Sequence, residues 1–474
     1  MSDSSYYDYT KTYNLTKIFR MPEDAELTPA ILKKFIDKNK QITLSKYSKL
    51  QRAYENDYDI FHMPKKKDNK PDNRLAANFA KYITDTMNGF FLGVPIKYDC
   101  ADDALKERLD FINAYNNIDD LNAELSKLMD MFGRGNELYF IDEKNQLGIC
   151  YLSPTNSFMI YDDSVREKPL YFVRYYLDAK NIEHGSVSDN SVVRWFTVKG
   201  GNLVFSPEEK AHGFADVPAT EYVENAERIG LYEGIMSLID SFNLGLSEKA
   251  NEIDYFGDAY MKILGTKLDN GDAQFIKNNR IINFEGDSDK IKVDFMNKPS
   301  ADETQEHHLE RLERLIFSMS MVANISDENF GTSSGIALKY KLLAMDNLAQ
   351  AKQRKFTAGL NRRYKVLFSN LISGIAENDW MKINYKFTRN YPANLSDEAD
   401  TAGKLAGITS NKTRLSVLSV VNDVDSELEQ IEREKDEEAY NTDYPTERSI
   451  GFSTGIGVKG KNSSMQGLKR MRRR

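Results

Sequence analysis

The feature that most constrains this chain is a pair of long amphipathic segments separated by a short insert. The first segment, Leu231–Leu264, repeats its apolar residues at steps of three, four and seven, the pattern of a helix with one apolar face. The second opens after Pro299 with Ser300 and Glu303 in the spacing of a capping box. At about 1.5 Å per residue, the two segments would form helices about 51 and 37 Å long, which is longer than ordinary core helices.

The second segment also predicts a narrow apolar seam. Its apolar side chains alternate at three- and four-residue spacing, which keeps them on one side of a helix. We expect this seam to face a neighbouring subunit, and the residues are Leu309, Leu312, Ile316, Met319 and Ala323.

Length and composition indicate a multidomain protein with real cores. A chain of 474 residues is too long for a single core, and 41% of its residues are hydrophobic. Two cysteines, Cys100 and Cys150, cannot build a disulfide framework and indicate a reducing compartment. We find neither a signal peptide nor a run of membrane-spanning length, so we expect a soluble protein that is cytoplasmic at synthesis.

The net charge of −8 is unevenly distributed. Since Lys459–Arg474 contributes +7, residues 1–458 carry −15. An acidic protein surface binds DNA weakly, because the neutralisation of phosphates by basic side chains supplies most of the non-specific affinity. It is compatible with a surface past which DNA slides, and equally with an ordinary solvated acidic surface.

Periodicity along the rest of the chain predicts helices first, then strands, then helices. We expect helices at 28–38 (capped by Thr28), 44–54, 74–88 (capped by Asn73), 102–115 and 119–132. Strands with alternating apolar residues follow at 137–142, 147–152, 157–161, 170–177, 192–198 and 202–205, and their short connections predict antiparallel pairing. A third long helix is expected at 336–375, a strand at 381–388 and further helix at 395–438. The fold class is therefore α+β and mainly helical.

The third long helix is strongly basic. Between Ile336 and Ile372 it carries a single acid, Asp346, and eight basic residues: Lys339, Lys341, Lys352, Arg354, Lys355, Arg362, Arg363 and Lys365. Like charges one helical turn apart repel, so this helix needs an anionic partner. Pairing with acids of a neighbouring subunit is our first interpretation, and contact with phosphates is the second.

A search for catalytic chemistry is negative. His307 and His308 are adjacent and point about 100° apart on a helix, so they cannot share a metal. The segment Gly455–Asn462 approaches a phosphate-binding loop, but Asn462 stands where Mg²⁺ needs a hydroxyl, and no apolar strand precedes it. The acids of 423–438 lie in a solvated charged stretch without a pocket. We expect no catalytic residue, no metal ligand and no cofactor.

Several motifs resemble those of bacteriophage portal proteins, most closely those of siphophages with Gram-positive hosts. They occur in the family's order over residues 40–440, and Ala219 departs from the usual aliphatic residue. The matching stretches are 73–82, 89–98, 132–139, 152–155, 160–162, 212–219, 238–243, 247–251 and 334–340.

The resemblance implies the portal fold, with wing, stem, clip and crown. It places an N-terminal extension and wing at 1–236, stem helices at 237–265 and 300–325, the clip at 266–299 and a tunnel loop at 326–335. A long kinked basic helix with a wing strand would occupy 336–394, the crown 395–444, and a flexible basic tail 445–474.

The tunnel loop would lie nearest DNA, and its small residues give it low conformational barriers. Its residues are Asp327, Glu328, Asn329, Phe330, Gly331, Thr332, Ser333, Ser334 and Gly335. The two acids discourage stable phosphate binding, and DNA would be held by shape rather than by base recognition.

The family also implies partners and a location. We expect a homo-oligomeric ring, a dodecamer, at one capsid vertex of the virion, assembled in the host cytoplasm. The ring would pass double-stranded DNA and contact the terminase large subunit, the head–tail adaptor, the major capsid protein and the scaffolding protein. The basic tail would contact packaged DNA or scaffolding protein, or would simply be a disordered solubilising segment. Two alternatives remain at this point: a helical adaptor or scaffold of the phage head, and a DNA-packaging enzyme.

Overall fold

We analysed a computed structural model of the chain. The structure describes residues 17–66, 71–256, 261–264, 292–295, 302–325, 335–391, 395–418, 420–421 and 424–442. The chain divides into two compact units, Met1–Tyr391 and Pro392–Arg474. The first unit mixes helices and sheets, as predicted.

The largest sheet of the first unit has six strands in the order β1-β5-β6-β7-β8-β9. They are β1 (Phe19–Arg20), β5 (Ser157–Tyr161), β6 (Pro169–Leu177), β7 (Glu183–Ser188), β8 (Val192–Lys199) and β9 (Asn202–Ala211). All neighbours pair antiparallel except β1, which runs parallel to β5. The antiparallel prediction is therefore confirmed for this sheet apart from β1. The sequence analysis missed β1 and β7, because two residues are too few for a pattern and EHGSVS is short and polar.

The six-stranded sheet packs on both faces. One face presents Phe158, Ile160, Val173 and Val187 to the main core, which includes Phe35 of helix α2 (Pro29–Ile42). The other face, at Met159 and Phe172, packs on a second sheet of β10 (Ala219–Val223), β3 (Arg134–Ile141) and β4 (Leu147–Leu152). Strand β10 was also missed; at five residues, it follows a Pro-containing loop directly.

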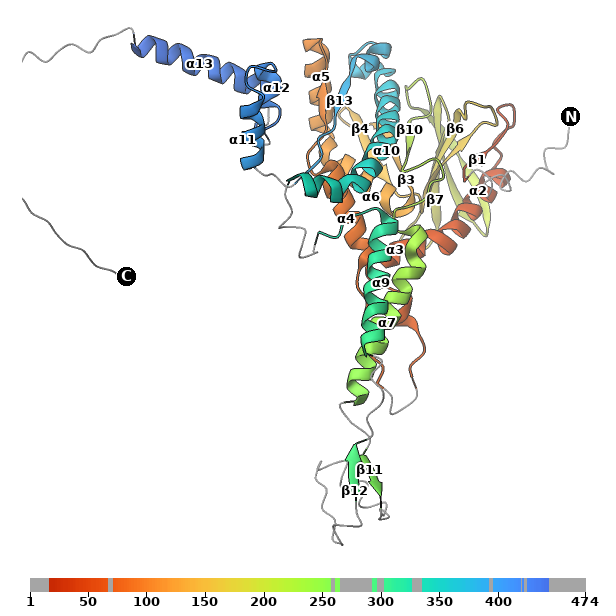
Figure 1. Cartoon of the computed structure of the whole chain (residues 1–474). Helices are drawn as coiled ribbons and strands as arrows, with labels where there is room; N and C mark the ends of the chain where they lie inside the picture. The colour runs from red at the N-terminus through yellow and green to blue at the C-terminus, as the bar shows by residue number, and fades with distance from the viewer. Residues whose placement is uncertain are drawn as a thin grey trace, which may run out of the picture. The chain divides into compact units, whose positions relative to one another are not determined.

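The far face of the second sheet carries three helices. They are α5 (Asp103–Tyr115), α6 (Ile118–Phe132) and α10 (Gly335–Phe368). Asp102 caps α5 by accepting from the N–H groups of Ala104 and Leu105. Gly133 ends α6 at φ 79°, where an added Cβ would meet the carbonyl of Arg228, so the turn into β3 requires glycine. Figure 1 shows α10 changing direction along its length.

Helices α7 (Met236–Phe256) and α9 (Asp302–Ser320) pack side by side and project from the body of the first unit (Figure 1). Both predicted helices were too long. The first ends at Phe256, and Met261–Leu264 instead forms strand β11, which pairs antiparallel with β12 (Lys292–Phe295). The second stops at Ser320, because Met321 adopts φ 60° and the Ser320 hydroxyl accepts from the Val322 N–H. Its predicted cap, Ser300, lies outside the described residues.

The remaining helical predictions hold with shifted boundaries. Helix α2 is capped by Thr28 as expected, and a π-helical turn at Thr43–Tyr47 leads into α3 (Ser48–Tyr54). Short 3₁₀ turns lie between the longer elements, at Asp59–His62, Glu233–Ile235, Leu371–Ser373 and Glu377–Lys382. Strand β13 (Asn384–Lys386) pairs with β2 (Lys97–Asp99). Strand β13 is shorter than the strand predicted at 381–388.

The described residues of the second unit form three helices where one continuous helical region was predicted. They are α11 (Leu395–Lys404), α12 (Asn411–Leu415) and α13 (Val424–Thr442). Gly407 interrupts the helical stretch at φ 79°, and Ser410 then caps α12 by accepting from the Thr413 N–H.

Helix α4 (Phe79–Leu92) begins five residues later than predicted, and its cap is Asn78 rather than Asn73. Residues 71–78 form no helix, and 73–77 run along α7. The N–H groups of Asn73, Leu75 and Ala77 donate to side chains one helical turn apart on α7. The acceptors are Asn251 Oδ1 at 2.5 Å, Ser247 Oγ at 2.9 Å and Asn243 Oδ1 at 2.8 Å.

This ladder works because the two periods match. Two residues of an extended chain advance about 6.6 Å, and four residues of a helix advance about 6 Å. Every second backbone N–H of the extended segment therefore meets every fourth side chain of α7. The polar face of α7 that the ladder uses is buried, so it replaces a strand partner for residues 73–77.

Replacing one acceptor of this ladder should destabilise the protein. We expect Ser247→Ala to lower the free energy of unfolding by about 1–3 kcal/mol, since it leaves a buried N–H unsatisfied. Urea unfolding followed by circular dichroism measures the change. Ser241→Ala, at an exposed position of the same helix, is the matched control and should change stability by less than about 0.5 kcal/mol. Equal effects in the two variants would contradict the ladder.

Candidate functional site

Helix α10 is attached to the second sheet by a buried arginine. The Arg363 guanidinium makes two hydrogen bonds with the Glu137 carboxylate of β3, Nη2–Oε1 at 2.7 Å and Nε–Oε2 at 2.9 Å, and both side chains have no exposed surface. Nη2 also donates to Asn122 Oδ1 of α6 at 2.8 Å. A bidentate pair fixes orientation as well as distance. Arg363 therefore sets the position of α10 against both β3 and α6.

A second buried cation lies three helical turns earlier on α10. Lys352 Nζ is 2.5 Å from Asp130 Oδ1 of α6 and 3.4 Å from Glu224 Oε2, just beyond β10. The ammonium also lies 5.2 Å from the centre of the Phe91 ring. The three charged groups are at most 1% exposed, so one cation is enclosed with two carboxyl groups.

The charge imbalance around Lys352 changes how the two carboxyl groups titrate. Burial raises the pKa of Asp130 to about 8, and the attraction of Lys352 offsets this only in part. Burial also raises the pKa of Glu224, again against the attraction of Lys352. Since one ammonium cannot balance two buried carboxylates, we expect the two carboxyl groups to hold one proton between them at neutral pH.

A third group of charges joins the two sheets. Glu221 of β10 accepts from Arg134, from Arg228 and from the hydroxyl of Tyr161 on β5. Burial opposes its ionisation, but the guanidinium groups of Arg228 and Arg134 outweigh burial and lower the pKa of Glu221 to about 2. Here the cations are in excess, so the carboxylate stays ionised.

These contacts revise the interpretation of the basic helix. Lys352 and Arg363 are buried, and Arg362 is paired with Asp216 at 3.0 Å and also donates to two backbone carbonyls. Their anionic partners therefore belong to the same chain, and expecting them to contact a neighbouring subunit or DNA was wrong. Lys341, Arg354, Lys355 and Lys365 are exposed, and the side chain of Lys339 lies outside the described residues.

The predicted tunnel loop is not described, apart from Gly335. Residues 326–334 lie outside the described residues, and Gly335 is the first residue of α10. The loop assignment therefore remains a prediction from the sequence.

The predicted seam of α9 faces inward. Leu309, Leu312 and Ile316 are 7%, 6% and 0% exposed in the single chain, where α9 packs against α7. Leu309 lies within 3 Å of the position a Cβ on Gly245 would take. Our expectation that these three residues face a neighbouring subunit was wrong, because α7 covers them. Met319 is 59% exposed, and Ala323 lies beyond the end of the helix.

Sequence reasoning missed the acids that hold α10. Asp130 lies on α6, Glu137 on β3 and Glu224 just beyond β10, and no local pattern distinguishes them from solvated acids. One signal was present: Glu137 is at the centre of a strand, where a charged residue is unusual, and it falls within a matching motif.

The described part of the chain offers no metal site. Among those residues, no group of three or more His, Cys, Asp or Glu side chains has the arrangement to hold a metal ion. Likewise, none of the described helices is both long and apolar enough to cross a bilayer.

Comparison with known proteins identifies the class. Residues 33–440 match the family model described as phage portal protein, SPP1 Gp6-like. The chain therefore belongs to this family of phage portal proteins, which are structural components of the portal vertex of the capsid. This membership agrees with the resemblance found in the sequence.

One curated relative agrees with the family. The chain is 23% identical over 386 residues to the portal protein of Clostridium phage phiCD119, covering 75% of this chain and 83% of that protein. A chain from the virion of a native gene transfer agent particle aligns with a TM-score of 0.42 and 11% identity, covering 79% of this chain and 93% of that one.

Removing the cation at Lys352 should be strongly destabilising. We expect Lys352→Met to lower the free energy of unfolding by about 3–5 kcal/mol, because it leaves two buried carboxyl groups without a counter-charge. Denaturant unfolding at a fixed protein concentration measures this. Lys355→Met on the same helix is exposed and should change stability by less than about 0.5 kcal/mol. A mild effect of Lys352→Met would refute the anchoring role.

The shared proton predicts a pH dependence. The folded pKa of Asp130, about 8, exceeds its ordinary value of 3.8, so the native state holds a proton that the unfolded chain releases. The resulting stabilisation is complete below the ordinary value and is lost as pH rises towards about 8.

Asp130→Asn removes this titration and leaves Lys352 paired with Glu224. We expect its free energy of unfolding to fall less between pH 5 and 8 than that of the wild type, when both are measured by urea unfolding. Parallel pH profiles for the two proteins would show that Asp130 does not hold the proton.

Proposed function

We propose that this chain forms a closed ring of identical subunits, a dodecamer, that conducts double-stranded DNA into and out of the capsid. The ring would dock the terminase large subunit during packaging and the head–tail adaptor afterwards, and would contact the major capsid and scaffolding proteins. Assembly would take place in the host cytoplasm. Family membership supports the portal role, and the ring count and each partner are our proposals.

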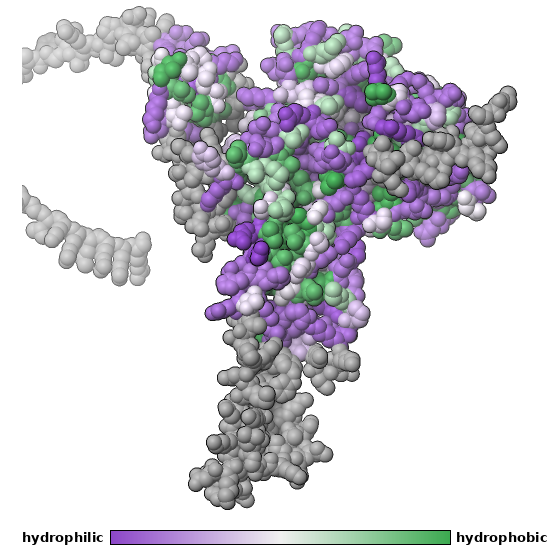
Figure 2. Space-filling view, turned by 45° about the vertical axis from the view of Figure 1, so that its right-hand side comes forward, coloured by the Kyte–Doolittle hydropathy of each residue, from purple (hydrophilic) through white to green (hydrophobic). Residues whose placement is uncertain are grey.

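The observation that carries the ring is apolar surface left open at the end of α9. Met319, Met321 and Ile325 are 59%, 40% and 50% exposed in the single chain, although the seam of α9 is already buried on α7. Figure 2 shows hydrophobic residues gathered on one face where the α7–α9 pair joins the body. Exposed apolar residues grouped in this way are typical of a surface that another subunit covers.

A ring of identical subunits uses two different surfaces per subunit, repeated at every joint. The exposed end of α9 supplies one of these surfaces. A substitution there is repeated in every joint of the ring, so a modest local cost becomes a large cost for closure.

We assign the portal regions to this structure as follows. The two sheets with α2–α6 would form the wing, α7 and α9 the stem, the paired strands β11 and β12 the base of the clip, and residues 395–444 the crown. The tunnel loop, 326–335, joins α9 to α10. Because Lys352 and Arg363 fix α10 to the wing, the loop is connected at one end to an anchored helix.

The exposed bases of α10 are the remaining candidates for contact with DNA or a neighbouring subunit. Of the residues predicted for this role, Lys341, Arg354 and Lys355 are exposed. Contacts of this kind follow charge and shape and do not read bases, which a conduit requires because base recognition would stall translocation.

The function we propose is not enzymatic. The near match to a phosphate-binding loop, Gly455–Asn462, lies outside the described residues and lacks the hydroxyl for Mg²⁺. Family membership also removes the support for a generic helical adaptor or scaffold.

The ring is tested by charging the open end of α9. We expect Met319→Glu with Ile325→Glu to abolish the ring, because an unpaired carboxylate would be buried at every joint. Analytical ultracentrifugation and native mass spectrometry measure the mass, which for the wild type should be near twelve times 54.3 kDa.

The matched control is Val165→Glu, which introduces the same charge at a fully exposed turn between β5 and β6. The control should retain the ring. Rings of unchanged mass in the double variant, or a wild type that stays monomeric at all concentrations, would overturn the proposal.

A further inference from the structure

The six-stranded sheet has a face that its neighbours cover only in part. At Met159 and Phe172 this face packs on Val217 and Ala219 beside the second sheet. Further along the same side, the pairing registers of β6, β7 and β8 place Arg174, Tyr176, His184, Trp195 and Thr197 on one surface. No described element covers this part, and Tyr176 and Trp195 are 51% and 38% exposed.

A hollow of about 440 Å³ opens on this surface. The hollow lies where the pairing of β8 and β9 shifts register. Arg194 pairs with Glu209, and Phe196 pairs with Phe205, so a step of two residues along β8 corresponds to a step of four along β9. The extra residues form a bulge that includes Pro207, which has no N–H to offer the ladder. Because the bulge is part of the backbone, the hollow is a fixed feature of the sheet.

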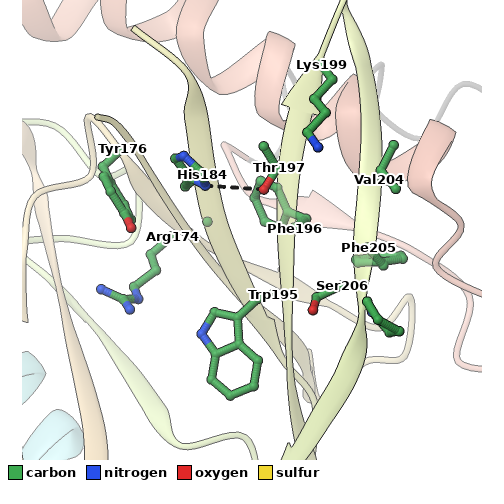
Figure 3. Close-up of a pocket in the computed structure, with 12 residues that line it drawn as sticks. Arg174, Tyr176, His184, Trp195, Phe196, Thr197, Lys199, Val204, Phe205 and Ser206 are labelled. Atoms are coloured by element: carbon green, nitrogen blue, oxygen red, sulfur yellow. Dashed lines mark hydrogen bonds between the residues drawn. The ribbon is translucent and has the colours of Figure 1, made fainter. Parts of the chain in front are cut away.

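The side chains around the hollow are held in place by one another. Arg174 Nε donates to Ser186 Oγ at 3.0 Å, which leaves the outer nitrogens of the guanidinium towards the opening. The His184 ring bonds to Thr197 Oγ1 at 3.2 Å and to Asp178 Oδ2 at 3.1 Å, and it stacks on Tyr176. Figure 3 shows Arg174, Tyr176, His184 and Trp195 rising from three adjacent strands around the same space.

The charge of the hollow is opposite to that of the chain. Its lining includes Arg174, Lys199 and His184 and no acid, whereas the whole chain carries −8. Asp178, close to the lining, is hydrogen-bonded to His184. Tryptophan, tyrosine and arginine are also the residues that dominate binding energy in protein interfaces.

We propose that this hollow, the β6–β9 pocket, binds an acidic polypeptide segment of another protein through an apolar anchor side chain. Trp195, Tyr176 and Val204 would take the anchor, and Arg174 and Lys199 would pair with carboxylates on either side of it. The proposal concerns the sheet surface and does not depend on the ring or its subunit count.

The probe is a fluorescein-labelled polyglutamate peptide with a central pair of phenylalanines, titrated with the full-length protein in fluorescence anisotropy. We expect saturable binding that weakens with added salt, as charge pairing requires. Trp195→Ala and Arg174→Gln should each weaken binding about tenfold or more. Lys199→Gln, at an exposed position, should weaken peptide binding less than the other two variants. It replaces either of them as the test if that variant fails to fold.

Two controls separate this pocket from general charge effects. Lys144→Gln removes the same charge at an exposed turn between β3 and β4 and should bind the probe like the wild type. The corresponding peptide with lysines in place of glutamates should not bind. Failure of the glutamate peptide to bind, equal binding by the pocket variants, or binding of the lysine peptide would each overturn the proposal.

Two further outcomes would assign the surface differently and so also overturn it. If Trp195→Ala changed the oligomeric mass of the protein, the surface would be an interface between copies of this chain. If a short double-stranded DNA bound wild type and lost affinity in Arg174→Gln but not in Lys144→Gln, the occupant would be nucleic acid.

Discussion

The position of α10 depends on charges buried between that helix and the second sheet. Arg363 is held by Glu137, and Lys352 by Asp130 and Glu224, with almost no contact with water. A buried charge that loses its partner costs several kcal/mol, so these groups must form together or not at all. The arrangement fixes one end of α10 while the other end follows the predicted tunnel loop. A portal needs both properties, a rigid frame and a segment next to DNA.

The projecting helices α7 and α9 pack against other parts of the same chain. The apolar residues of α9 at three- and four-residue spacing are used within the chain, against α7. The polar face of α7 receives the extended segment 73–77 through a matched ladder of hydrogen bonds. What remains for a neighbouring subunit is the exposed end of α9 around Met319 and Ile325. In the ring that we propose, subunit contacts and folding contacts are thus separated along α9 and the residues that follow it.

Helix positions and most strands could be predicted because their causes are local. The Thr28 cap and the alternation in β3, β4 and β5 depend on neighbouring residues alone. The errors occurred where tertiary contacts decided the outcome. Residues 73–77 are extended because α7 offers acceptors to them, and Met261–Leu264 is a strand because Lys292–Phe295 pairs with it. Helical periodicity continued through both segments and could not distinguish the alternatives.

The sequence by itself determined the class of protein, the mixed helical and sheet content and the two projecting helices, since order of motifs and apolar spacing are properties of the chain. The tertiary structure decided which charges of α10 are structural, because Asp130, Glu137 and Glu224 come from distant elements and meet only in the folded core. It also decided which face of α9 stays open and where the bulge in β9 forms a hollow. Such features depend on which surfaces meet in the folded chain, and the spacing of residues in the sequence does not predict this.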